Sequence, residues 1–114
     1  MSTFPEADWK YLRSMQDELM QRFCEKANQK SKQILDDSNL DSYERYKKLF
    51  NHTEDSDERL ASCFDDWRRS TVFSRLLWIM KERLLSDAEL HNLSSETQNR
   101  ITLSRVFWQN DKDV

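Results

Sequence analysis

The sequence contains no glycine, and its only proline is Pro5. A chain of 114 residues would ordinarily carry about eight glycines, at an average usage of roughly 7%. Glycine supplies the positive φ angles that tight hairpins and strand bulges need. A sheet protein is difficult to build without it, whereas a few long helices joined by Ser, Asn and Asp need none. The missing glycine therefore predicts an all-α fold, which the abundance of helix-forming residues also favours.

The same absence excludes several classes of enzyme site. A P-loop, a dinucleotide-binding fingerprint and a G-x-S-x-G elbow each need glycine at fixed positions, so none is present. Neither His52 nor His91 follows a glutamate by three residues, as a di-iron bundle requires. The segment Asp37–Lys48 begins like a calcium loop but lacks its glycine and its final glutamate. We therefore expect no catalytic residue, metal site or cofactor, and a protein that is not an enzyme.

Charge and cysteine content restrict the partners and the compartment. The formal net charge of −3 gives no electrostatic reason to expect binding to nucleic acid or to an anionic membrane. Cys24 and Cys63 lie far apart within apolar helical patterns, which favours buried thiols over a disulfide or a metal pair. The first residues lack the basic and apolar segments of a secretory signal. The longest apolar stretch, Leu76–Met80, is too short to cross a bilayer. We expect a cytoplasmic protein without a membrane partner.

Aromatic residues supply much of the material for a core. Four Trp, six Phe and three Tyr offset a hydrophobic fraction of only 37%, because each aromatic side chain buries a large area. Such a content also argues against wholesale disorder. The chain is therefore predicted to form a single helical domain over residues 1–114.

Helix boundaries are marked by capping signals. A box at Thr3–Glu6 predicts a first helix over about 5–37, which ends in a run of turn-forming residues. Boxes at Asp41–Glu44, Ser86–Glu89 and Ser95–Gln98 predict helices that start near 42, 87 and 96, and the last two are expected to end near 92 and 109.

The second helix is predicted to be unusually long. From Tyr46 to Trp78 a heptad-like ladder of mainly apolar residues keeps its phase through the polar segment Asn51–Arg59. This favours one helix over 42–85, of about 44 residues and about 65 Å at 1.5 Å per residue. The alternative is a break at Thr53–Ser56. Between Val72 and Leu85 apolar residues occupy nearly every side, which is typical of a buried helix.

These elements predict a long antiparallel helical hairpin plus a short helix and a C-terminal helix, in a helical bundle. The second helix is too long to bury its ladder against the first, and uncovered ladders of this kind usually mark an interface. We therefore predict a homodimer in a bundle or antiparallel coiled coil. The candidate interface residues are Tyr46, Phe50, Phe64, Trp67, Trp78, Arg68 and Arg75.

The most distinctive local sequence is Asp65–Thr71. Trp and Arg are frequent in binding hot spots, but Trp67 can equally be a core residue and Asp65 can pair with Arg69 one helical turn away. We predict a protein–protein interaction or scaffold protein. The alternative is a nucleic-acid-associated regulator that uses a sector of three arginines, with Asp65 and Glu82 intruding on it. That sector comprises Arg68, Arg75 and Arg83.

Three segments together resemble a group of small, uncharacterised bacterial all-helical proteins. They are Glu44–Tyr46, Phe64–Thr71 and Leu85–Leu90, and the resemblance extends from about Asp8 to Ile101. It implies a bacterial, cytoplasmic protein and carries no activity.

Overall fold

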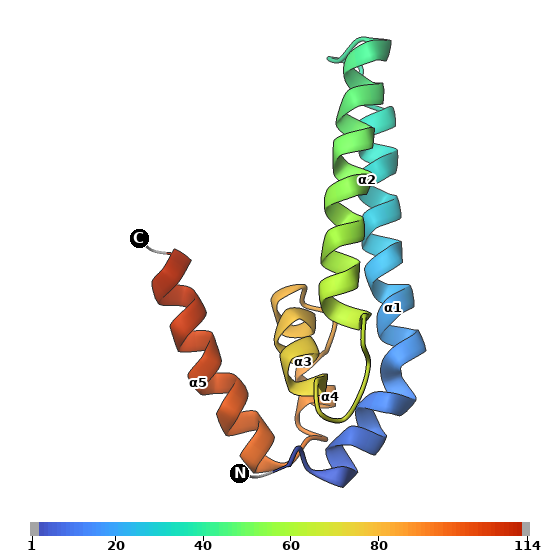
Figure 1. The fold of residues 1–114 in the computed structure, drawn as a ribbon. Helices are drawn as coiled ribbons and strands as arrows, with labels where there is room; N and C mark the ends of the chain where they lie inside the picture. Colours follow the sequence, from blue (N-terminus) through green and yellow to red (C-terminus); the bar gives the residue numbers. More distant parts are fainter. Residues whose placement is uncertain (1–2, 113–114) are drawn as a thin grey trace.

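The computed structural model describes residues 3–112, and for residues 105–112 it describes the backbone only. The described chain is helical, without a strand, and confirms the all-α fold class (Figure 1). The five helices are α1 (Glu6–Leu35), α2 (Ser42–Phe64), α3 (Val72–Lys81), α4 (Asp87–Leu90) and α5 (Ser95–Lys112). Helices α1 and α2 lie side by side as the predicted antiparallel hairpin, and α5 points away from the remaining helices.

The predicted helix over 42–85 is wrong, because α2 ends at Phe64 and α3 starts only at Val72. Asp65 is extended and Asp66 takes a φ of 53°, so the chain leaves the helical direction there. The Thr71 hydroxyl donates to the Asp66 carbonyl and accepts from the Arg68 N–H at 3.2 Å, which closes the loop. The alternative break at 53–56 is also wrong, since α2 continues through these residues. The ladder keeps its phase across a loop by coincidence.

Two of the predicted capping boxes are confirmed. The Asp41 carboxylate accepts from the Glu44 N–H at 2.8 Å, and Glu89 pairs reciprocally with Ser86. The box at Thr3 is wrong, because Pro5 occupies the N-cap position of α1 without a side-chain bond.

The last helix also differs slightly from the prediction. It begins one residue earlier, where the Thr97 N–H donates to the Ser94 hydroxyl at 3.3 Å. Val106, Phe107 and Trp108, which the sequence places on this helix, lie outside the residues whose side chains are described.

The core lies at the base of the hairpin, around α3 (Figure 1). Leu76 and Ile79 of α3 are fully buried, in one apolar cluster with Leu12 and Leu19 of α1 and with Leu93 and Ile101. The prediction that the segment 72–85 contains a buried helix is thus confirmed. Cys63 is buried and Cys24 is half-buried, and both are free thiols, as expected from their positions.

Beyond the core, α1 and α2 continue as a two-helix arm, which we call the distal arm (residues 24–56; Figure 1). Only Ile34 and Ser56 are buried in this arm. The seam between its helices is partly polar, since the His52 Nε2 atom lies 3.0 Å from the Ala27 carbonyl oxygen. The Ser56 hydroxyl lies 3.4 Å from the other ring nitrogen of His52. The arm therefore has little apolar contact of its own.

Candidate functional site

The side of α2 that faces away from α1 carries three exposed aromatic residues. Tyr43 is 70% exposed, Tyr46 67% and Phe50 50%. At 100° per residue these side chains share one face, about half a turn from His52 and Ser56 on the seam. We call Tyr43, Tyr46 and Phe50 the outer stripe. The prediction named Tyr46 and Phe50 but missed Tyr43, although Tyr43 precedes Tyr46 by one helical turn.

The other predicted aromatic interface residues do not join this stripe. Phe64 is buried, and its ring centre lies 5.8 Å from that of Trp67. Trp67 also packs on Trp9, with ring centres 6.3 Å apart. Trp78 is half-buried, and the ammonium of Lys81 lies 4.8 Å from its ring centre. Phe64 and Trp67 are therefore core residues, which leaves the outer stripe as the exposed part of the predicted ladder.

The three arginines of the alternative prediction do not form one helical sector. Arg68 lies in the loop before α3 and makes a two-point ion pair with Asp66, at 2.6 and 2.8 Å. This pairing lowers the pKa of Asp66. Arg75, on α3, donates to the Ser62 carbonyl at 2.9 Å. Arg83 follows the end of α3. Two of the three guanidinium groups are thus engaged within the chain.

The expected pair between Asp65 and Arg69 is also wrong, because both residues lie in the loop rather than on a helix. The Arg69 Nε atom instead donates to the Phe4 carbonyl at 2.6 Å, which fastens the start of the chain to this loop.

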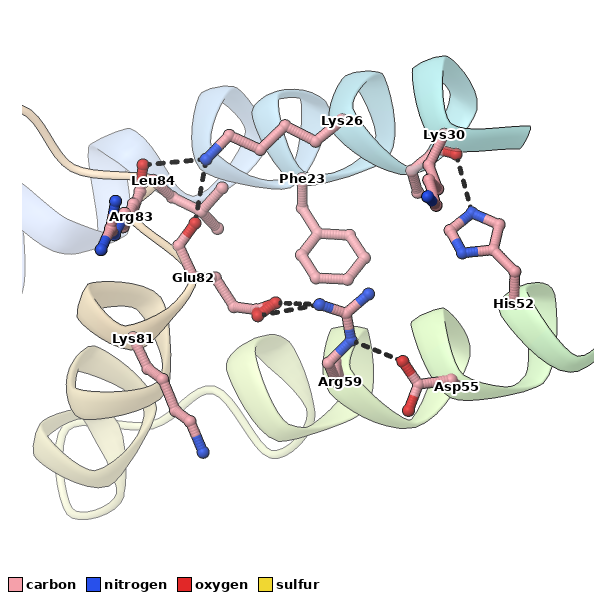
Figure 2. A pocket seen from close by; sticks show the side chains of 11 residues that line it. Phe23, Lys26, Lys30, His52, Asp55, Arg59, Lys81, Glu82, Arg83 and Leu84 are labelled. Carbon is pink, nitrogen blue, oxygen red and sulfur yellow. Dashed lines mark hydrogen bonds and ion pairs between the residues drawn. The ribbon is translucent and has the colours of Figure 1, made fainter. Parts of the chain in front are cut away.

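A pocket of about 470 Å³ lies between α1, α2 and the end of α3 (Figure 2), and we call it the basic pocket. Two carboxylates line it, and both are paired with Arg59. Glu82 accepts from Arg59 at 2.7 and 3.2 Å, and Asp55 lies 3.1 Å from the Arg59 Nε atom. Four further cationic side chains line the pocket: Lys26, Lys30, Lys81 and Arg83. The pocket therefore carries an excess of positive charge in a chain whose net charge is negative.

The end of α3 forms one wall of this pocket. Its last turn closes with the Arg83 N–H on the Met80 carbonyl, at 3.0 Å, and the Leu84 N–H on the Ile79 carbonyl, at 3.2 Å. This pair of bonds is the Schellman motif, which places a left-handed residue directly after the C-cap. Here that residue is Arg83, with a φ of 58°. The ammonium of Lys26 donates to the carbonyls of residues 82 and 83, at 3.0 and 3.2 Å.

Two well-connected carboxylates at the base of the fold serve the packing of the helices. Asp8 is 3% exposed and accepts from the Ser94 N–H at 2.9 Å and from the Ser94 and Thr97 hydroxyls at 2.6 Å each. Glu89 forms a two-point ion pair with Arg22, at 2.6 and 2.8 Å. The Arg22 guanidinium lowers the pKa of Glu89 to about 2. These bonds fasten α4 and α5 to α1.

No protein-family model, curated protein or solved structure matches this chain. The resemblance to small bacterial proteins therefore stays a hypothesis. Among residues 3–104, whose side chains are described, no group of three or more His, Cys, Asp or Glu is arranged to hold a metal ion. None of the helices within residues 3–112 combines the length and the apolar content needed to cross a membrane. The two features that stand out from the fold are thus the outer stripe and the basic pocket.

Proposed function

We propose that the protein is a non-enzymatic interaction protein that acts as a helical homodimer, paired through the outer stripe of α2. The observation that carries this proposal is the exposure of three large aromatic side chains on one face of one helix. Tyrosine and phenylalanine rings are enriched at interfaces, because they bury much area at a small cost in side-chain entropy. Lys47 lies over the Phe50 ring without covering the stripe.

The charges on α2 favour an antiparallel pairing with a second copy. Upstream of Phe50 the helix is net basic, with Arg45, Lys47 and Lys48 against Glu44, and downstream it is net acidic, with four carboxylates against Arg59. Those four are Glu54, Asp55, Asp57 and Glu58, of which Asp55 is already paired with Arg59 at the basic pocket. If two copies of α2 run antiparallel with Phe50 at the two-fold axis, each basic segment faces the acidic segment of the other copy. In this register Lys47 lies opposite Thr53 and next to Glu54 of the other copy. A parallel pairing would instead set like charges against each other.

The weak seam of the distal arm supports the same conclusion. His52 and Ser56 occupy positions where a self-sufficient hairpin would place apolar side chains. A second copy across the outer stripe would add apolar contact to the arm and hold α2 from its other side. The role of such a protein is to form the assembly itself. The paired distal arms would present a longer helical surface than one chain can.

Light scattering on the purified chain tests the dimer. We expect about twice the chain mass of 13.9 kDa at tens of micromolar protein. Phe50→Glu should give the monomer, because it places two carboxylates together at the axis. Asn51→Glu is the matched control, since Asn51 is an exposed neighbour off the stripe, and it should leave the mass unchanged. A wild-type mass of one chain, or equal loss of the dimer in both variants, would contradict the proposal.

Cysteine cross-linking tests the register, in a Cys24→Ser background that removes the half-buried thiol. A residue at a two-fold axis lies next to its own copy. Phe50→Cys should therefore form an intermolecular disulfide under mild oxidation, whereas Tyr43→Cys should not. Cross-linking at both positions would indicate a parallel dimer, and cross-linking at neither would refute the pairing through this stripe.

A further inference from the structure

The basic pocket has more positive than negative side chains, and contacts within the fold do not neutralise the excess. Both of its carboxylates pair with the single Arg59, which neutralises one of their two charges, and four further cations line the same pocket. Lys30 and Arg83 make no ion pair with any carboxylate in the described part of the chain. Lys81 likewise makes no ion pair with a described carboxylate, and its ammonium lies over the Trp78 ring. Positive groups that gather in a concave site of a net-negative protein focus an attractive potential for anions.

The end of α3 would ordinarily repel an anion, because a helix C-terminus presents free carbonyl groups. Here four of the five carbonyls of residues 79–83 accept a hydrogen bond, and that of Lys81 is the exception among the described bonds. The Schellman bonds use the carbonyls of Ile79 and Met80, and Lys26 holds those of Glu82 and Arg83. The wall of the pocket is therefore left with its side-chain charges as the dominant electrostatic feature.

The cations stand at two ends of the pocket (Figure 2). Lys30 lies beside His52 at one end, and Lys81 and Arg83 lie at the other, with Phe23 and the paired Arg59 between them. An anion that meets both groups must therefore extend past Phe23 and Arg59 and carry charge along its length.

Arg83 adds an independent indication. It occupies a left-handed position where glycine is usual, and a residue with a Cβ costs about 1 kcal/mol or more there. Strained residues of this kind concentrate at ligand sites. The strain fixes the backbone from which the Arg83 side chain lines the pocket.

We propose that the basic pocket binds a small, elongated anion with a chain of phosphate groups. Lys30 would hold one end, and Lys81 and Arg83 the other. The volume of about 470 Å³ lies within the usual range for small-ligand sites, about 300–1,000 Å³. Lysine and arginine are the side chains that bind phosphate most often in proteins. The site needs no glycine-rich loop, because side chains rather than backbone N–H groups provide the contacts.

Isothermal titration calorimetry with tripolyphosphate, at low salt and without divalent metal, tests the proposal. We expect binding by the wild-type chain and about tenfold weaker binding by Lys30→Gln and by Arg83→Asn, each of which removes one charged hydrogen-bond donor. Asparagine is chosen because it tolerates the left-handed position. Lys32→Gln is the matched control, since Lys32 is exposed on the same helix but outside the pocket. It should change the affinity less than twofold.

Two further titrations, with ATP and with inorganic phosphate, define the ligand. ATP that binds with the same dependence on Lys30 and Arg83 would identify nucleoside triphosphates as a source of the phosphate chain. Inorganic phosphate should bind at least tenfold more weakly than tripolyphosphate, because it reaches only one end. Phe50→Glu should bind tripolyphosphate as the wild type does, since Phe50 lies outside the pocket, so this proposal and the dimer fail separately.

Four results would overturn the proposal. They are no heat of binding at ~1 mM tripolyphosphate, equal weakening by Lys32→Gln, equal affinity for inorganic phosphate, and displacement of tripolyphosphate by a tighter-binding single-stranded RNA. The last result would assign the cations to a nucleic-acid surface instead.

Discussion

Replacing Arg83 by glycine should stabilise this protein, although it deletes a side chain from a structured site. Arg83 has a φ of 58° in the Schellman motif that ends α3. Its guanidinium makes no hydrogen bond within the described part of the chain, so the side chain contributes little to stability. Its Cβ, in contrast, clashes with the backbone in the left-handed conformation.

The magnitude follows from two opposing terms. A residue with a Cβ costs about 1–2 kcal/mol in the left-handed region, and glycine removes that cost. Glycine also gives the unfolded chain more freedom, which costs about 0.5–1 kcal/mol. Arg83→Gly should therefore raise the free energy of unfolding by about 0.5–1 kcal/mol, which corresponds to a Tm higher by about 2–4 °C in a chain of this size.

Urea unfolding followed by circular dichroism, at one protein concentration, measures this change. Arg83→Ala is the control, because it removes the same charge and keeps the Cβ, and it should change the stability by less than about 0.5 kcal/mol. If Arg83→Gly is no more stable than Arg83→Ala, the backbone at residue 83 is not strained and the reasoning fails. Because Arg83→Gly also removes a cation from the basic pocket, the same variant should bind tripolyphosphate more weakly while it unfolds at higher urea.

Three further predictions concern two carboxylates and one thiol at the base of the fold. Asp8→Ala should lower the free energy of unfolding by about 2–4 kcal/mol in urea titrations, since it leaves three donors without an acceptor; a loss below 1 kcal/mol would contradict this. The folded-state pKa of Glu89, about 2 against an ordinary 4.5, gives a stabilising contribution of about 2 kcal/mol that is complete above pH ~4.5 and is lost as the pH falls towards 2. Glu89→Gln should flatten that part of the pH–stability profile, and an unchanged profile would argue against the pair with Arg22. Burial raises the pKa of Cys63 to about 12, so a maleimide should label one thiol per native chain, at Cys24; rapid labelling of two would show that Cys63 is accessible.

Capping boxes in the sequence predicted the starts of two helices correctly. The boxes at Asp41 and Ser86 each bring their own donor and acceptor within four residues, so no tertiary contact is needed to form them. Thr3 carries the same pattern, but the burial of Phe4 and the position of Pro5 at the N-cap decide the start of α1 instead. A tertiary contact there overrides the local preference.

The boundary between α2 and α3 was not predictable from breakers, because the chain has none there. Asp66 takes a left-handed conformation in the place of a glycine, and the Thr71 hydroxyl closes the loop. The sequence pattern assigned Tyr46 and Phe50 to the candidate interface but did not identify the face of α2 that packs on α1. The large apolar residues Tyr46 and Phe50 mark the outer face, while His52 and Ser56 form the seam. Hydrophobic periodicity identifies the face that needs cover, and within one chain this need not be the face that packs.

The basic pocket could not be predicted from local sequence signals. Its cations come from α1 and from the end of α3, more than 50 residues apart between Lys30 and Lys81, so no spacing in the sequence joins them. The sequence pattern placed Arg83 in a cationic sector together with Arg68 and Arg75. In the structure those two arginines instead bind Asp66 and the Ser62 carbonyl. The basic pocket forms because the loop between α2 and α3 turns the chain after Phe64. No glycine or proline in the sequence marks this loop.

The polar seam leads to a last prediction, on the dynamics of the distal arm. Because the arm buries only Ile34 and Ser56, its helices should open locally at a lower free energy than the base of the hairpin. In Phe50→Glu, which is expected to be monomeric, backbone amides at 43–52 should exchange with solvent much faster than in the wild type. Amides at 60–64, which lie against the core, are the internal control and should exchange equally in both proteins. Hydrogen exchange followed by mass spectrometry or NMR measures both segments. Equal protection of 43–52 in the two proteins would mean that the seam holds the arm without a partner, and it would remove the second support for the dimer independently of its measured mass.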